Sequence, residues 1–239
     1  MLNLAEYRRR DTRLADYLPW ACLVAPGVVL NKDGSFQRTF RYRGPDLDSA
    51  TPAELVAVSA RLNNVVKRFG DGWALFLEAE RSPAQGYPPG RFGDPVSWLI
   101  DEERRAAFEA EGAHYESRYH LTLLFLPPPD AARTAERFFT ERAEPQSTVA
   151  DIRTQLAAFM TETDRALEML STLLPEGEAL DDAATLTYLH GAISDRRHAI
   201  AVPTTPAYLD AVLCDTTLTG GLEPMLGSQH LRLLTISGF

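Results

Sequence analysis

The clearest alternation of apolar and polar positions predicts a β-hairpin between residues 28 and 42. Asp33-Gly34 separates two arms rich in β-branched and aromatic residues, and this dipeptide readily adopts the positive φ angles of a tight turn. The alternating positions of the second arm are Phe36, Arg38, Phe40 and Tyr42. One face of this hairpin is therefore expected to be buried.

Helical spacing of apolar residues follows the hairpin. Thr51-Pro52-Ala53-Glu54 is typical of a helix start, because Thr caps the first turn, Pro fits the first helical position and Glu completes a capping box. The apolar positions behind it are Leu55, Val58, Leu62, Val65, Val66 and Phe69. Gly70 is expected to end this helix, and Trp73 to Leu77 to form a short buried strand.

A second helix and strand are predicted after a loop rich in Gly and Pro, residues 82–93. Asp94-Pro95 is again a cap with a first-turn proline, and the helix is expected to run to about Gly112. Residues 118–126 are predicted to form a strand that Pro127 stops. The order hairpin, helix, strand, helix, strand indicates an α+β fold, a mainly antiparallel sheet with helices packed on one face.

A long helical pattern at 147–174 and a second one at 181–195 are separated by Pro175 and Gly177, which predicts a helical hairpin. The chain is therefore divided into a sheet domain, residues 1–145, a helical hairpin insertion, 146–200, and return strands that complete the sheet, 201–239. The last strand-like run, 231–236, ends at Phe239 without a polar tail, so we expect a larger protein to continue beyond it.

The first 18 residues have an apolar stripe and a basic side. The stripe holds Leu4, Tyr7, Leu14 and Leu18, and the arginines mostly off it are Arg8, Arg9, Arg10 and Arg13. One interpretation is an amphipathic segment that contacts a membrane surface or a partner. The other is a packed first helix with a solvated arginine face, which the acidic Asp11 on the stripe favours.

Composition narrows the class of protein. The net charge of −9 and the pI near 5.1 argue against a protein-wide nucleic-acid surface, because such a surface is basic. Cys22 and Cys214 lie far apart, form no disulfide framework and fit a reducing compartment. The longest apolar run, residues 20–30, is interrupted by Pro26-Gly27 and is shorter than the roughly 18 residues that span a bilayer.

No residue pattern indicates a catalytic, cofactor-binding or metal-binding site. Residues 221–228 come nearest to a phosphate-binding loop, but they lack its lysine and have one residue too many between the glycines. No two histidines have the His-x-x-x-His spacing of a zinc site, and neither cysteine has a ligand partner close to it in sequence. Glu78 and Glu80 share a strand face, which suits an acid–base pair but equally a solvated strand edge.

Basic and aromatic residues alternate in the second arm of the hairpin. Arg38, Arg41 and Arg43 are candidate nucleic-acid contacts, with neighbouring aromatic rings able to stack on bases. The alternative, which we favour, is a core-facing aromatic row with the arginines outward.

Five segments, taken in order along the chain, resemble one known family. They are Leu14-Ala-Asp-Tyr-Leu-Pro-Trp-Ala21, Phe40-Arg-Tyr-Arg-Gly-Pro-Asp46, Glu78-Ala-Glu-Arg81, Ala207-Tyr-Leu-Asp-Ala-Val-Leu213, and the ending from Leu218 to Phe239. Together they are similar, over essentially the whole chain, to the N-terminal domain of the TrbE, CagE and VirB-type conjugal-transfer ATPases of type IV secretion systems, most of all to TrbE.

The resemblance implies a docking domain with no enzyme activity of its own. In that family ATP and Mg²⁺ belong to a RecA-like motor domain, which would follow residue 239, and no nucleotide-binding residue carries over to this chain. The implied partners are inner-membrane components of the secretion system and other motor subunits in a homo-oligomer. The implied location is the cytoplasmic face of the bacterial inner membrane. We expect the segment around Arg8, Arg9 and Arg10 and the helices at 147–195 to provide the docking surfaces.

Two other function classes stay open. One is a self-contained small enzyme, which a pocket gathering Glu78, Glu80 and a histidine with a shifted pKa would support. The other is a nucleic-acid-binding domain centred on Arg38, Arg41 and Arg43, which steep salt dependence of DNA binding would support.

Overall fold

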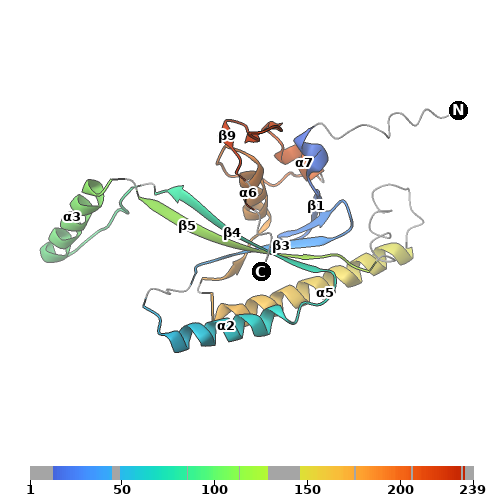
Figure 1. Cartoon of the computed structure of the whole chain (residues 1–239), viewed down its shortest axis with the longest axis horizontal. Coiled ribbons are helices and arrows are strands. Elements are labelled where there is room, and N and C mark those ends of the chain that lie inside the picture. Colours follow the sequence, from blue (N-terminus) through green and yellow to red (C-terminus); the bar gives the residue numbers. More distant parts are fainter. Residues whose placement is uncertain are drawn as a thin grey trace.

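The computed structural model describes residues 13–44, 49–84, 86–112, 114–128, 146–174, 176–205, 207–232 and 234. Within these ranges one antiparallel sheet has the strand order β1-β2-β3-β5-β4 (Figure 1). Its strands are β1 (Trp20–Ala25), β2 (Val28–Asn31), β3 (Phe36–Tyr42), β4 (Trp73–Pro83) and β5 (Tyr115–Phe125). A short strand, β6 (Glu178–Ala179), pairs with the far end of β3. The predicted α+β class is confirmed.

The hairpin of β2 and β3 forms at the predicted turn. Gly34 has a φ of 84°, a left-handed conformation that glycine adopts without a steric penalty. The carboxylate of Asp33 accepts hydrogen bonds from the backbone N–H of Ser35 at 2.9 Å and from its hydroxyl at 2.7 Å. These local bonds hold the turn, and they explain why the sequence located it correctly.

Two helices begin at the predicted caps. Helix α2 (Pro52–Val66) has Thr51 as its N-cap with the expected capping box to Glu54, but it ends four residues before Gly70. Helix α3 (Pro95–Ala110) is capped by Asp94, whose carboxylate accepts a 2.9 Å hydrogen bond from the N–H of Ser97. Both starts follow from local side-chain chemistry.

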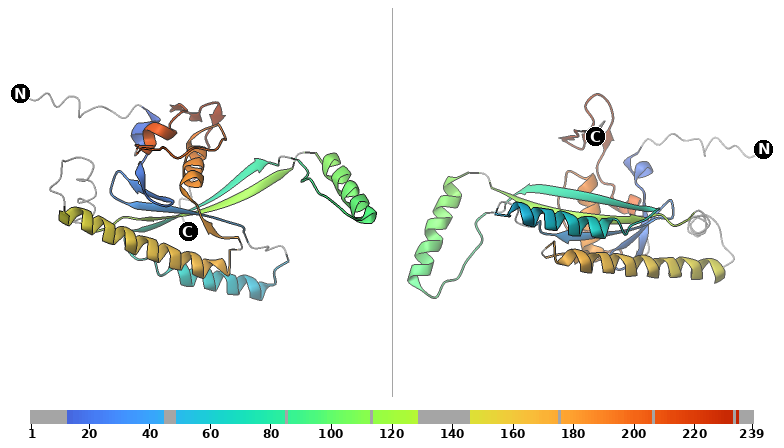
Figure 2. Two further views of the ribbon diagram at one scale, coloured as in Figure 1. Left: turned by 180° about the vertical axis from the view of Figure 1, so that it is seen from behind. Right: turned by 60° about the horizontal axis from the view of Figure 1, so that its bottom comes forward.

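Helices cover both faces of the sheet, which corrects the expectation of a single covered face. Helix α5 (Gln146–Ser171) packs Phe159 against Val28 and Leu30 on one face. On the other face α6 (Asp182–Ile193) and α7 (Leu209–Leu213) pack against Val29, together with Leu18 beyond α1 (Leu14–Tyr17). Figures 1 and 2 show α2 and α5 on one side and α6 and α7 on the other. The reason is the unbroken apolar run of β2, which needs cover on both faces.

The predicted helical hairpin of 146–200 is therefore wrong. Between α5 and α6 the chain forms β6, which pairs with Phe40 and Arg41 of β3, and it passes the sheet there to reach the opposite face. The backbone N–H of Leu180 continues this pairing with a 3.0 Å hydrogen bond to the carbonyl of Thr39. Helices α5 and α6 thus pack on the sheet and not on each other. The domain boundaries themselves stay a prediction.

The last segment does not complete the main sheet, contrary to expectation. Strands β7 (Leu218–Thr219), β8 (Met225–Leu226) and β9 (Gln229–His230) pair with one another in a separate small sheet, and none of their described residues pairs with the main one. Within the expected strand at 231–236, the described residues Leu231, Arg232 and Leu234 are not in a strand. Strands of two residues joined by tight turns are too short to span the larger sheet.

Strands β4 and β5 continue beyond the sheet as a two-stranded ribbon that carries α3 at its end (Figure 1). They pair without interruption from Trp73 opposite Phe125 to Pro83 opposite Tyr115, so both are longer than predicted. Over the residues that the structure describes, no helix combines the length and the apolar character that crossing a membrane requires.

Candidate functional site

A polar groove lies between the ribbon and α6, with a volume of about 670 Å³. The ribbon contributes Glu78, Glu80 and His120, and the helix and the segment after it contribute residues such as Tyr188 and Arg197. The antiparallel register places Glu78 opposite His120, and Glu80 lies two residues further along the same face. Two carboxylates and a histidine that are distant in sequence are thereby brought to one wall.

His120 is the least ordinary residue of this wall. It is buried, with 6% of its surface exposed, and its Nδ1 has no hydrogen-bond partner among the described residues. Its ring lies 4.5 Å from that of Tyr188, measured between centroids. Burial lowers the pKa of His120, and the nearby carboxylates of Glu78 and Glu80 only partly oppose this effect.

Both carboxylates already have partners. The hydroxyl of Tyr188 donates a 2.8 Å hydrogen bond to Oε2 of Glu78, and Nη1 of Arg197 lies 3.4 Å from Oε1 of Glu80. Burial and the hydrogen bond to Glu78 raise the pKa of Tyr188, so its hydroxyl acts as a donor. Arg197 approaches across Gly191, where a Cβ atom would collide with the guanidinium group. These contacts join the helix to the ribbon.

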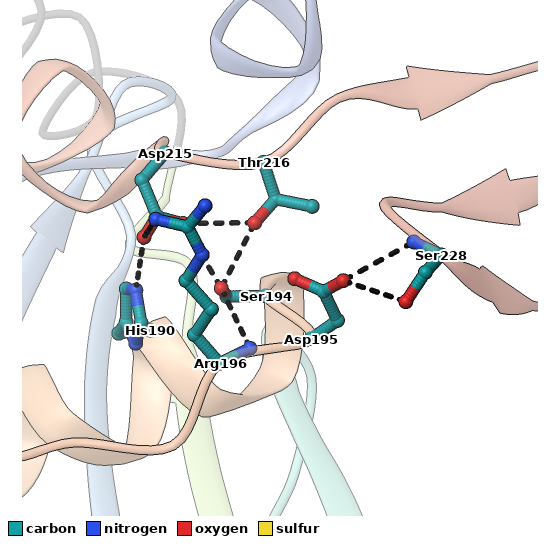
Figure 3. A network of polar contacts seen from close by, with 7 residues as sticks. All are labelled: His190, Ser194, Asp195, Arg196, Asp215, Thr216 and Ser228. Carbon is teal, nitrogen blue, oxygen red and sulfur yellow. Dashed lines mark hydrogen bonds and ion pairs between the residues drawn. The ribbon is translucent and has the colours of Figure 1, made fainter.

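A network of polar contacts beside the groove holds the last segment in place (Figure 3). The carboxylate of Asp215 accepts 2.9 Å hydrogen bonds from the hydroxyls of Ser194 and Thr216, and its Oδ2 lies 3.2 Å from Nε2 of His190. Burial opposes ionisation of Asp215, but the contacts with Thr216, His190 and Ser194 prevail and lower its pKa to about 2. The serine bonds to the aspartate and not to the histidine, so this is no Ser–His–Asp relay.

The same network reaches the small sheet. The carboxylate of Asp195 accepts hydrogen bonds from the N–H of Ser228 at 3.1 Å and from its hydroxyl at 3.0 Å. These two bonds lower the pKa of Asp195. Positions after α6 thus anchor the turn between β8 and β9, as Figure 3 shows.

The three arginines of β3 do not form one exposed surface. Arg38 lies on the same face as Phe40, is 8% exposed, and donates hydrogen bonds to Thr163 at 2.9 Å and to Asp164 at 2.6 Å on α5. Arg41 and Arg43 point to the other face. They pair with carboxylates just after α5, Arg41 with Glu178 and Arg43 with Glu176. The expectation that all three arginines point outward therefore holds for two of them only.

The basic N-terminal candidates lie almost wholly outside the described residues. Arg8, Arg9 and Arg10 are not described, and the role proposed for them stays a prediction. Arg13 is exposed and immediately precedes α1, where its backbone N–H donates a 3.0 Å hydrogen bond to Asp16.

The described residues do not fit a nucleotide or a metal ion. A phosphate-binding loop needs a lysine and a helix that starts directly after it, whereas residues 221–228 lead from the β7–β8 turn through β8 towards β9. No group of three or more metal-ligating side chains occurs in the described part of the chain. We therefore derive no reaction step through ATP or Mg²⁺ for these residues.

Helix α3 presents an apolar surface that sequence reasoning missed. None of its residues, all of which the structure describes, is buried. Val96, Leu99 and Ile100 are 63%, 54% and 47% exposed, with Trp98 beside them. Their spacing is that of a buried helical face, so the signal was present but pointed to the protein's own core.

The opposite face of α3 is held by the loop before it. The hydroxyl of Tyr87 donates a 2.7 Å hydrogen bond to Asp101, and the guanidinium of Arg105 lies over the Tyr87 ring at 5.5 Å. The Phe108 ring stacks on that of His114, with 3.5 Å between centroids. The helix is therefore fixed on the ribbon with its apolar face turned to solvent.

Comparison with known proteins identifies the family. The sequence model of the N-terminal domain of the type IV secretion system ATPase VirB4/TrbE matches residues 27–133, which include β2 to β5. A probable conjugal transfer protein TrbE of Sinorhizobium fredii is 41% identical over 138 residues, which cover 56% of this chain and 92% of that protein.

Longer relatives match most of this chain over a smaller share of their own length. The conjugal transfer protein TrbE of Rhizobium radiobacter is 31% identical over 255 aligned positions, which cover 100% of this chain and 31% of that protein. The type IV secretion system protein virB4 of Brucella suis is 23% identical over 92% of this chain and 28% of its own length. The chain thus spans about a third of these two relatives. On these matches, it belongs to the family of N-terminal domains of the VirB4/TrbE type IV secretion system ATPases.

Proposed function

We propose that this domain docks a secretion motor onto inner-membrane components of a type IV secretion system, at the cytoplasmic face of the bacterial inner membrane. We propose further that it takes part in contacts between motor subunits. The observation that carries docking is α3, with the exposed Val96, Leu99 and Ile100 held away from the core on the β4–β5 ribbon. Contiguous exposed apolar residues on a protein surface mark interaction sites.

The geometry of α3 suits a docking element. The contacts of Tyr87 and Phe108 hold the helix before any partner arrives, so little conformational entropy is lost on binding. Trp98 adds a large side chain of the kind that contributes most to protein interfaces. The ribbon separates this surface from the groove and from the last segment, so a partner on α3 leaves both accessible.

The test compares variants of the tagged chain in cells with and without the conjugation genes. Inner membranes are solubilised in detergent, and the secretion components that co-purify are identified by mass spectrometry. The double variant Val96→Glu, Leu99→Glu should lose these components, because it places two charges on the proposed contact. Leu222→Glu is the matched control, since Leu222 is fully exposed in the small sheet region and its substitution should change nothing.

Unchanged co-purification by the α3 double variant would contradict docking through α3. Removal of residues 1–18 tests the basic segment in the same assay, and unchanged association would count against its role. Circular dichroism of each variant shows whether the fold is kept.

ATP and Mg²⁺ are proposed to bind in a motor domain outside residues 1–239. The description of the matched family as an ATPase supports this proposal, as does the length of the relatives beyond the matched part. The purified chain should not hydrolyse ATP, whereas a longer protein with the motor domain should. Hydrolysis by residues 1–239 alone would refute this division of labour.

A second candidate function, a small enzyme or polar-ligand site, is favoured by the groove. It gathers Glu78, Glu80 and His120, whose pKa is lowered. A thermal-shift screen of small polar compounds tests it, with His120→Gln as the variant expected to remove any shift. The absence of any ligand-dependent shift would remove this candidate. Nucleic-acid binding is not favoured, because Arg38 is buried against α5.

A further inference from the structure

Strand β4 forms one edge of the main sheet, and its backbone pattern shows which residues face outward. The N–H of Leu126 bonds to the carbonyl of Gly72 at 2.7 Å, and the N–H of Ala84 to the carbonyl of His114 at 2.8 Å. Both pairs belong to the continuous β4–β5 register. In an antiparallel ladder the paired residues alternate between hydrogen-bonded and non-hydrogen-bonded. Even-numbered residues of β4 therefore direct their N–H and C=O groups to β5, and odd-numbered residues direct theirs outward.

Four consecutive odd positions present outward backbone groups: Leu75, Leu77, Ala79 and Arg81. No hydrogen bond outside the sheet pairings involves their N–H groups within the described part of the chain. The row ends at Pro83, which has no N–H to offer, and begins at Trp73, whose N–H contacts the carbonyl of Gly70 at 3.4 Å. An edge with this many open groups is a template for a further strand.

The side chains of this edge are apolar at its centre. Phe76 is 55% exposed on the α6 face, and Leu77 is 72% exposed on the α5 face. Large apolar side chains on both faces of an unpaired edge strand are unusual, because native edges are normally shielded by charge or by cover. The centre of the β4 edge therefore has both the backbone pattern and the apolar side chains of a strand pairing.

We propose that β4 pairs antiparallel with β4 of a second copy of this chain, about a two-fold axis at Phe76. In this register Leu75 of one copy lies opposite Leu77 of the other, and both use their outward N–H and C=O groups. Phe76 then faces Phe76 of the second copy in a non-hydrogen-bonded pair, where side chains approach most closely and aromatic pairs are favourable.

Charges favour this occupant and this register. Glu78 falls opposite Ala74 of the second copy and Glu80 opposite Gly72, so no carboxylate meets another. Arg81 extends towards Asp71 of the second copy, an exposed residue of opposite charge. Moving the axis to Glu78 would instead place two glutamates opposite each other, which destabilises a strand pair. The sequence of the edge is thus complementary to itself.

This inference rests on the proposed function in one respect, the contact between subunits, and it says where that contact lies. Because the pairing is antiparallel, the two ribbons point in opposite directions and both α3 helices stay accessible. Dimerisation through β4 and docking through α3 therefore use separate surfaces. Loss of one leaves the other measurable.

The first test measures the mass of the chain by sedimentation velocity from about 1 to 200 μM, a range that brackets a micromolar dimer. The unmodified chain should dimerise as concentration rises. Phe76→Glu and Phe76→Lys should each be monomeric, because each places like charges opposite each other. An equimolar mixture of the two should dimerise again. Leu222→Glu, at an exposed position away from the edge, should behave like the unmodified chain.

The second test fixes the register by oxidation in a chain with Cys22→Ser and Cys214→Ser. Phe76→Cys should form an intermolecular disulfide, since directly opposite positions of a non-hydrogen-bonded pair are about 4.5 Å apart between Cα atoms. Leu77→Cys should not, because Leu77 faces Leu75 of the second copy. A disulfide at 77 and none at 76 would overturn the register.

A chain that is monomeric throughout, or a dimer that survives Phe76→Glu, would overturn the pairing itself. If the Phe76→Glu variant still co-purifies secretion components, failure of the pairing leaves the docking function intact. If the α3 double variant loses them and still dimerises, the two contacts are separate, as inferred.

Discussion

Tyr188 of α6 and Glu78 of β4 are joined by a 2.8 Å hydrogen bond across the groove, 110 positions apart in the sequence. This bond connects the helix on one face of the sheet to the ribbon that carries α3. We expect Tyr188→Phe to lower the free energy of unfolding by about 1–2 kcal/mol, because the glutamate loses a donor and the groove allows water to replace it in part.

Urea unfolding of Tyr188→Phe, Glu78→Gln and the double variant measures the coupling. The double variant should cost less than the sum of the two single variants, since both remove the same bond. Strict additivity would show that the hydrogen bond contributes nothing to stability.

The two arginines on opposite faces of β3 should differ in their effect on stability. Arg38→Met leaves Thr163 and Asp164 without their buried donor, and we expect a loss of about 2–3 kcal/mol. Arg41→Met breaks a pair in which both side chains are about half exposed, and a change below about 0.5 kcal/mol is expected. Equal effects of the two substitutions in urea unfolding would contradict the burial of Arg38.

Stability should fall with pH through His120. Burial holds its folded-state pKa below the unfolded value of about 6.5, so the unfolded chain binds the proton more readily. The stability due to neutral His120 is complete above that pH and decreases as the pH drops below it. His120→Gln should flatten the decrease in the urea midpoint between pH 7.5 and 5.5. The exposed His230→Gln is the control, and an equal flattening there would refute the assignment.

Gly27 is expected to tolerate no side chain. Its φ is 66°, and a Cβ atom would collide with the carbonyl of Leu180. Gly27→Ala should cost more than about 2 kcal/mol, because left-handed backbone alone costs roughly 1–2 kcal/mol for other residues. Gly70→Ala is the control, since Gly70 has no neighbour within 4 Å. Thermal unfolding of both variants gives the comparison, and similar melting temperatures would contradict the close approach at Gly27.

Local signals predicted the elements well and their arrangement less well. The turn at Asp33-Gly34 and the caps at Thr51 and Asp94 depend on residues within four positions, and all three form as expected. The groove depends on the register between β4 and β5 and on the packing of α6. Nothing near Glu78 in the sequence indicates that Tyr188 is its partner.

The wrong expectations have a common cause, which is that spacing does not say what covers a residue. Arg38 occupies a position in the apolar alternation, and Asp164 on α5 makes its burial tolerable. The pattern at Val96 and Leu99 has the period of a core helix, yet α3 lies beyond the sheet. Helices α5 and α6 look like a hairpin because two residues between them, Glu178 and Ala179, are too few to be noticed as a strand.

The place of α5 in the chain bears on how the protein is made. Apart from β6, every described strand of the main sheet lies before residue 126, so the sheet can assemble on the ribosome before α5 is synthesised. Until then the face with Phe36, Phe40 and Leu123, all buried in the finished protein, has no cover from that helix. A nascent chain paused between residues 126 and 146 is thus at its most aggregation-prone, and synthesis of α5 ends that exposure.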